Sequence, residues 1–258
     1  MVSFRVNKSC RAYQMPDNLA NTVYSKDMEM QMIGSSTQVN FFINKTLLKA
    51  DNKAILKLVP FIEDGFVPSF GEEVNGNGVK NKILRIEKES EGLICTITFG
   101  IQAISFQFDS SVTEVKAELF EKVQILVKKL VLLFDSELSE VNRISVVINQ
   151  GYEYNADFEA RIHNKFFKSE IIPYEWNFRR ACEAEFENVP IYHILAVTKG
   201  TAIININGAI SERNTVLLSV DNNVNVDIAS QKFRLDDLSF AGSLFSKSVT
   251  DYYNLFGE

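Results

Sequence analysis

The sequence has few of the residues that build metal and redox sites. Among its 258 residues are two histidines, His163 and His193, and three scattered cysteines, Cys10, Cys95 and Cys182. No Cys-x-x-Cys, His-x-Glu or His-Glu-x-x-His pattern sets two of them at metal-ligand spacing. An odd number of distant cysteines also argues against a disulfide framework. We therefore expect no metal and no cofactor, although ligands from distant residues could still converge in the fold.

Long apolar runs are missing as well. No stretch reaches the length that a membrane-spanning helix needs, and the first eight residues lack the apolar centre of a secretory signal. These two absences predict a cytoplasmic protein without a membrane partner.

A large excess of positive charge is also absent. The chain has 27 Lys and Arg against 33 Asp and Glu, a net charge of −6. Because phosphate backbones are bound by clustered basic residues, nucleic acid is not expected as a direct main partner, while a local basic patch stays open. An acidic mimic of nucleic acid is a further alternative, but the charge is modest and mixed.

Motifs of catalysis are weak. The glycine-rich segment Gly71–Asn81 has no Lys-Ser/Thr after it and opens no helix, so it indicates a hairpin or surface loop rather than a phosphate-binding loop. Cys182 and His193 could form a dyad on adjacent strands, but no helix N-terminus or nucleophile elbow activates the thiol. An enzyme is therefore the less favoured class.

The most regular stretch lies in the middle of the chain. Apolar residues from Val115 to Phe134 recur at steps of three and four, which predicts an amphipathic helix over residues 112–134. The β-branched run Arg143–Asn149 predicts a strand. Further amphipathic helices are expected over residues 156–167 and 235–256, and residues 82–88 and 92–108 are expected to form two or three antiparallel strands.

Two stretches match at an offset of one hundred residues. Thr98-Phe-Gly100 and Thr198-Lys-Gly200 are each followed by an alternating apolar pattern, and two strands share the ending Ile-Asn, at Asn44 and Asn149. The second match places a hairpin turn at Lys199-Gly200. The alternative is that two β-meanders look alike because alternation and turn glycines are common.

We favour an internal duplication, because the order of predicted elements repeats along with the short pattern. The predicted fold is α+β: two similar strand–helix–β-meander–helix units with antiparallel sheets, packed as one pseudo-duplicated body. Residues 38–140 and 141–258 would form the units, after a strand-containing N-terminal segment, residues 1–37. The default pocket would lie between the halves.

One aromatic and basic cluster has the composition of a contact surface. It follows Pro173 and consists of Tyr174, Trp176, Phe178, Arg179 and Arg180. Because Trp, Tyr and Arg dominate interface hot spots, these residues are candidates for binding a partner. The alternative for Trp176 is a place in the core.

The strand Arg143–Asn149 and the end of the chain carry a resemblance. An aspartate-bearing strand, Val224–Asp227, precedes a long helix that contains Phe245 and ends in Tyr252–Phe256. In these features the chain resembles a sporadically distributed family of uncharacterised bacterial proteins of similar length. The resemblance implies a bacterial or phage origin and brings no established activity.

Together these features predict a non-catalytic protein-binding or scaffold subunit of a bacterial or phage complex, or a homo-oligomer. Defence against phage, or its inhibition by phage, is the suggested context. The alternative is a small-ligand sensor or an enzyme, with a site between the two halves that joins His193 to acidic residues.

Overall fold

The computed structural model describes residues 31–74, 76–111, 118–134, 140–167, 169, 171–206, 209–225 and 232–256. The strands of this part of the chain are β1 (Met32–Phe42), β2 (Val67–Val74), β3 (Lys80–Ser90), β4 (Leu93–Phe99), β5 (Ala103–Ser110), β6 (Arg143–Glu153), β7 (Trp176–Phe186), β8 (Val189–Ile206) and β9 (Ala209–Val224). The helices are α1 (Asn52–Lys57), α2 (Val59–Glu63), α3 (Leu119–Phe134), α4 (Ala156–Phe166) and α5 (Ser239–Phe256).

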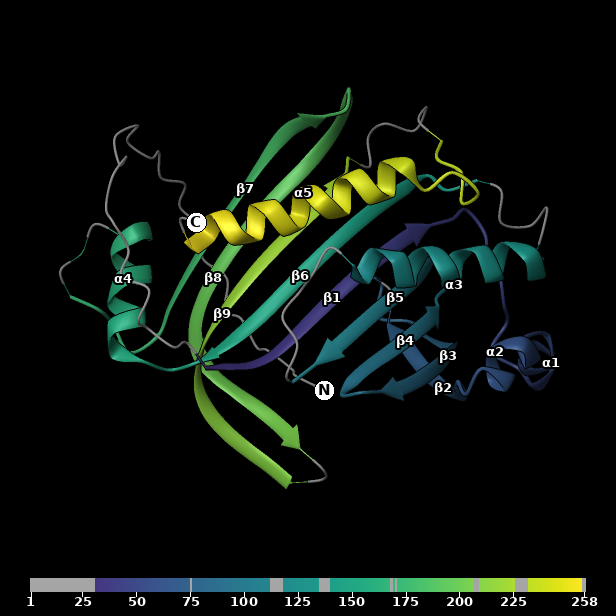
Figure 1. The fold of residues 1–258 in the computed structure, drawn as a ribbon, viewed down its shortest axis with the longest axis horizontal. Coiled ribbons are helices and arrows are strands. Elements are labelled where there is room, and N and C mark those ends of the chain that lie inside the picture. The colour runs from purple at the N-terminus through teal and green to yellow at the C-terminus, as the bar shows by residue number, and fades with distance from the viewer. Residues whose placement is uncertain are drawn as a thin grey trace.

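All nine of these strands belong to one antiparallel sheet, in the order β2-β3-β4-β5-β1-β6-β9-β8-β7. The central strands β1 and β6 pair along almost their whole length, from Phe42 opposite Arg143 to Met32 opposite Tyr152. The β1–β6 ladder, which has one register shift between Met32 and Gly34, therefore joins the first and second parts of the chain, and Figure 1 shows the two strands side by side.

The predicted fold of two packed α+β units, each with its own sheet, is wrong. Each unit was expected to have its own antiparallel sheet, but β1, the first strand of the first unit, is paired on both sides, with β5 and with β6. Because one face of β1 is apolar and buried under the helices, its backbone N–H and C=O groups need hydrogen-bond partners on both edges. This requirement favours one large sheet over two small ones.

The match at an offset of one hundred residues also fails in the structure. Gly100 lies in the connection between β4 and β5, where its N–H donates to the carbonyl of Ala103 at 2.9 Å. Gly200 lies inside β8, which runs without a turn through the expected hairpin at Lys199-Gly200. Similar residue patterns therefore occupy different structural positions.

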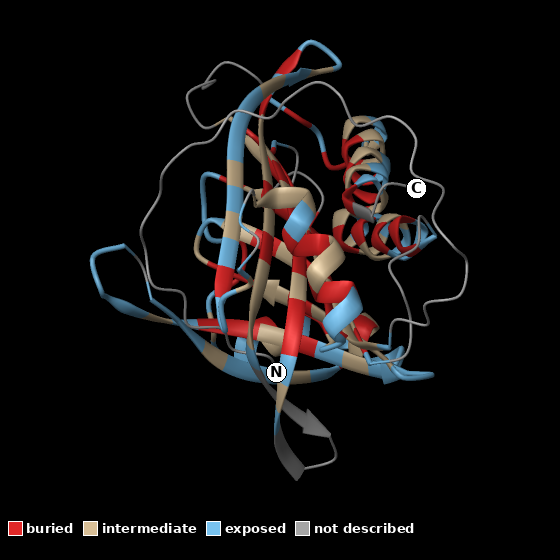
Figure 2. Cartoon of the chain, turned by 90° about the vertical axis from the view of Figure 1, so that its left-hand side faces the viewer, coloured by how far each residue is buried: buried red, intermediate tan, exposed pale blue. Residues whose placement is uncertain are grey.

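Helices α3 and α5 lie on the same side of the sheet (Figures 1 and 2). The predicted long helices are thus present, although α3 begins at Leu119 and residues 112–117 lie outside the described residues. Both helices bury their apolar stripe against alternating residues of the strands, as the period of two in a strand requires. The centre of this core consists of Val39, Phe41, Phe106, Val127, Val146, Ile148, Val220, Leu244 and Phe245, each 1% exposed or less.

Close packing joins the two long helices. The ring of Phe120 on α3 lies 5.4 Å from that of Phe245 on α5. A Cβ atom at Gly242 would stand 3.0 Å from the Phe120 ring, so glycine at this position permits the close approach of α5. A helix able to span a membrane is absent from the described part of the chain.

The opposite face of the sheet bears polar and charged side chains. Asn40 donates to Ser145 at 2.9 Å across the β1–β6 pair, and the Arg143 guanidinium lies 3.8 Å from the centre of the Phe42 ring. Burial raises the pKa of the Asp221 carboxyl, although the positive charge of Arg143 acts to lower it. This face thus combines half-buried charges with neutral polar groups.

Candidate functional site

The five predicted partner-binding residues are divided between different environments. Trp176 is 6% exposed, Phe178 is half-buried, and Tyr174 is 73% exposed. Because residues alternate along a strand, Arg179 points to the sheet face opposite that of Trp176 and Arg180. The structure thus places Trp176 in the core and leaves Tyr174 as the exposed aromatic residue of the group. The partner-binding role of the five stays a prediction.

Trp176 is held by helix α4. The side chain of Asn155 caps this helix by accepting hydrogen bonds from the backbone N–H groups of Asp157 and Phe158. The cap fixes the first turn, in which Phe158 is fully buried and Glu159 lies beside it. Helix α4 thereby places the Glu159 carboxylate beside buried apolar side chains such as Phe158.

Glu159 is the acceptor of a buried ion pair. Its Oε1 lies 2.6 Å from Nζ of Lys199 on β8, and Trp176 donates its indole N–H to the same oxygen at 2.9 Å. The Glu159 and Lys199 side chains are only 4% and 11% exposed. A charged pair this deeply buried requires further hydrogen bonds to offset the cost of desolvation, and Trp176 supplies one of them.

The electrostatics keep Glu159 ionised. Burial alone would raise the pKa of the Glu159 carboxyl, but hydrogen bonds from Lys199, Trp176 and Tyr154 outweigh it and lower the pKa. The hydrogen bond to this carboxylate raises the pKa of the Tyr154 phenol in turn. At neutral pH the site thus holds an ionised Glu159 carboxylate and a protonated Tyr154 phenol.

Two tyrosines lie beside this ion pair, and we call them the tyrosine patch. The Lys199 ammonium is 4.7 Å from the centre of the Tyr154 ring and 5.7 Å from that of Tyr174. Both distances fall within the range of a cation–π interaction. Tyr154 and Tyr174 remain exposed, as does Ile171 three residues earlier. The tyrosine patch therefore exposes two aromatic rings that the buried Glu159–Lys199 ion pair holds in place.

Reasoning from sequence missed Glu159, Lys199 and Tyr154. One signal was available: Glu159 falls between Phe158 and Ile162 on the apolar side of the predicted helix, where an unpaired carboxylate would be costly. Its partner Lys199 could not be inferred, because it lies forty residues away in a segment whose turn was misplaced.

A second polar cluster lies between α5 and the sheet. The Nδ1 atom of His193 is 2.6 Å from the Asn222 amide oxygen and 3.4 Å from an Asp251 carboxylate oxygen. The Asn222 amide N–H group donates to Asp251 and to Ser248, each at 2.9 Å. Lys247 forms an ion pair with Asp251 at 2.7 Å. Buried Asn222 therefore orients a histidine and a carboxylate toward each other.

Cys182 lies directly across from His193 in the β7–β8 register. The thiol is exposed, and its Sγ atom is 3.7 Å from the backbone carbonyl oxygen of His193. The two residues of the sequence-predicted dyad are thus neighbours, and Asp251 is the third polar member that sequence reasoning did not identify.

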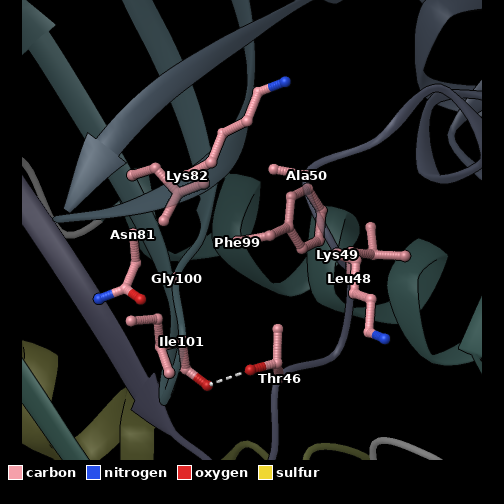
Figure 3. A pocket seen from close by; sticks show the side chains of 10 residues that line it. Thr46, Leu48, Lys49, Ala50, Asn81, Lys82, Phe99, Gly100 and Ile101 are labelled. Atoms are coloured by element: carbon pink, nitrogen blue, oxygen red, sulfur yellow. Dashed lines mark hydrogen bonds between the residues drawn. The ribbon is translucent and has the colours of Figure 1, made fainter.

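A small pocket lies between the start of β3, the end of β4 and the segment that follows β1 (Figure 3). It has a volume of about 240 Å³, and its lining consists of Thr46, Leu48, Lys49, Ala50, Asn81, Lys82, Ile83, Phe99, Gly100 and Ile101. The ammonium groups of Lys49 and Lys82 point away from each other, so they do not converge on one ligand.

Family models and curated proteins give no guide to this site. Neither a family model nor a curated protein matches the chain. Within the described ranges no group of three or more His, Cys, Asp or Glu residues could hold a metal ion. The crevice that was expected between two halves is occupied at the β1–β6 junction by buried apolar side chains such as Val39 and Val146.

Proposed function

We propose that this protein is a non-catalytic protein-binding subunit and that the tyrosine patch contacts its partner. The observation that carries the proposal is the exposure of Tyr154 and Tyr174 around a buried ion pair between Glu159 and Lys199. Tyrosine supplies a large amphipathic contact area, and it is enriched at the hot spots of interfaces.

The rigid base of the patch supports this role. Binding costs less conformational entropy when the contact side chains are already ordered in the free protein. Lys199 restrains both rings through its ammonium group, and Glu159 holds that group in place. An arrangement that is preorganised in this way suits a docking surface better than a catalytic site.

The proposal extends to the cellular context. A bacterial or phage origin and a link to anti-phage defence rest on the family resemblance of the sequence. Challenge of the native host with phage, with and without the intact gene, tests that context separately from the binding surface.

Replacing Tyr174 by alanine is expected to weaken capture of the partner at least about tenfold, because hot-spot truncations cost about 2 kcal/mol or more. The measurement is quantitative mass spectrometry of proteins retained from native lysate by immobilised wild-type and Y174A protein. Leu132→Ala is the matched control, because Leu132 is an 84% exposed apolar residue on α3. Equal capture by wild-type and Y174A protein would remove the patch from the proposal.

A second candidate function is an enzyme that uses Cys182 as its nucleophile. One observation favours it: His193 is oriented by Asp251 and Asn222 and lies across from an exposed thiol. A base that is held by a third polar group follows the general logic of activated nucleophiles.

For this second candidate, His193→Ala is expected to slow alkylation of Cys182 by iodoacetamide about tenfold at neutral pH, since the thiolate is the reactive form. Peptide mass spectrometry follows each cysteine separately. Cys95 is the internal reference, because burial raises the pKa of its thiol to about 12. Unchanged alkylation of Cys182 in H193A protein would exclude a dyad.

A further inference from the structure

The strands β8 and β9 continue past the rest of the sheet as a two-stranded arm, residues 200–206 and 209–214 (Figure 1). Strand β7 begins at Trp176 opposite Lys199, and β6 ends its pairing at Glu153 opposite Thr215. Beyond these positions, β8 and β9 remain paired with each other as far as Ile206 opposite Ala209. In the described part of the chain, the β8 side of the arm therefore has no neighbouring strand.

The β8 side of the arm lacks the protection that the two outer strands of the sheet carry. Strand β2 contains Pro68 and two glutamates, and β7 contains two arginines and two glutamates. Charges and proline on outer strands prevent pairing with other chains. By contrast, the β8 side of the arm, residues 200–206, contains no charged residue and no proline, and the two charges of the arm, Glu212 and Arg213, belong to β9.

The sequence of the β8 side favours strand pairing. Residues 201–206 read Thr-Ala-Ile-Ile-Asn-Ile, an uncharged segment in which four of the residues are β-branched. Uncharged segments of high β propensity are the ones that add to one another through backbone hydrogen bonds. A two-stranded hairpin on its own is only marginally stable in water, so a third strand would stabilise the arm.

We infer that the β8 side of the arm pairs antiparallel with the same strand of a second copy of this chain, forming a two-fold dimer. A second copy is the occupant that fits, because an uncharged segment is complementary to itself and offers nothing that selects a charged partner. The inference is independent of the tyrosine patch, and it concerns the purified protein alone.

The test uses the register of the arm. Position 203 lies at the middle of residues 200–206, so a two-fold pairing over this whole stretch sets it opposite its own copy, whereas within the arm its register partner is Glu212. A lysine at position 203 therefore gains an opposite charge inside the hairpin and meets a like charge across the dimer. Ile203→Lys is thus expected to keep the fold and to abolish the dimer.

Sedimentation equilibrium over a dilution series measures the mass. Wild-type protein is expected to approach twice the chain mass of 29.3 kDa on concentration, and I203K protein to remain at the single mass. Leu132→Lys, which places a charge on exposed α3, should dimerise as the wild type does. An equal mixture of I203K and I203E/E212K proteins is expected to recover the double mass, because opposite charges then meet across the dimer and each arm keeps an opposite-charge pair within itself.

Circular dichroism and the fluorescence of Trp176 confirm that each variant is folded. A single mass for wild-type protein throughout the series would overturn the inference. So would a double mass for I203K protein, or a failure of the mixed charge variants to recover the dimer.

Discussion

Replacing Lys199 by methionine is expected to lower the free energy of unfolding by about 3–5 kcal/mol, because it leaves the Glu159 carboxylate buried without its counter-ion. Both side chains of the pair are almost fully buried, so solvent does not replace the lost interaction. Methionine keeps the length and apolar stem of lysine, and the change therefore isolates the ammonium group.

Urea denaturation monitored by circular dichroism and by fluorescence measures the effect. Trp176 is the single tryptophan of the sequence, and its indole contacts Glu159 directly. The double variant K199M/E159Q is expected to regain a large part of the lost stability, because an amide can still accept from Trp176 without an unpaired charge. A loss below about 1 kcal/mol for K199M would show that the pair behaves like an exposed surface ion pair.

The same pair predicts a pH dependence. The pKa of Glu159 is lowered in the folded protein, so its contribution to stability is complete above the pKa of the unfolded carboxyl. That contribution is lost as the pH falls through the lower, folded-state value. In K199M protein, burial instead favours the protonated carboxyl. The difference in stability between wild type and K199M should therefore shrink in acid.

Replacing Phe106 by alanine is expected to cost about 3–5 kcal/mol, the usual range for a fully buried aromatic residue. Phe106 lies on β5, and its ring packs edge-on against that of Phe41 on β1 at 5.8 Å. The informative readout is the fluorescence of Trp176, which lies at the far edge of the same sheet. Because one sheet and one core connect the two residues, the midpoint that Trp176 reports should fall as far as the midpoint by circular dichroism.

Ile125→Ala is the matched control, because Ile125 is an exposed apolar residue on α3 and its loss should change stability by less than about 0.5 kcal/mol. Two separate transitions in F106A protein, with the Trp176 signal unshifted, would contradict a single cooperative sheet. They would instead support independent folding of residues 38–140 and 141–258, a division that stays a prediction.

Sequence patterns located many of the local elements of this fold. Helix α4 was expected over residues 156–167 and is found over Ala156–Phe166, and the period of three to four residues also identified α3 and α5. The meander from β3 to β5 was expected from its alternation. These elements depend on periodicity and capping, which neighbouring residues determine.

Other elements gave no such signal. Strand β2 is mostly exposed and lacks alternation, so the sequence from Val67 to Val74 did not indicate a strand. Strand β8 passes through Lys199 and Gly200 because its partner β9 continues beside it, and that partner is distant in the sequence. For the same reason the prediction of the candidate site was incomplete. Tyr174 was identified from the sequence, but the Glu159–Lys199 ion pair beside it was not.

The sequence alone thus determined the amphipathic helices, the alternating strands and the aromatic residues near Trp176, because each depends on residues close together in the chain. Tertiary structure decided the rest. The pairing of β1 with β6 turned two expected units into one sheet, and the packing of α4 on β7 and β8 brought Glu159 to Lys199. A strand pairs with whichever distant strand completes its backbone hydrogen bonds, and a buried charge pairs with whichever distant residue supplies the opposite charge. The periodicity of residues along the chain does not specify either partner.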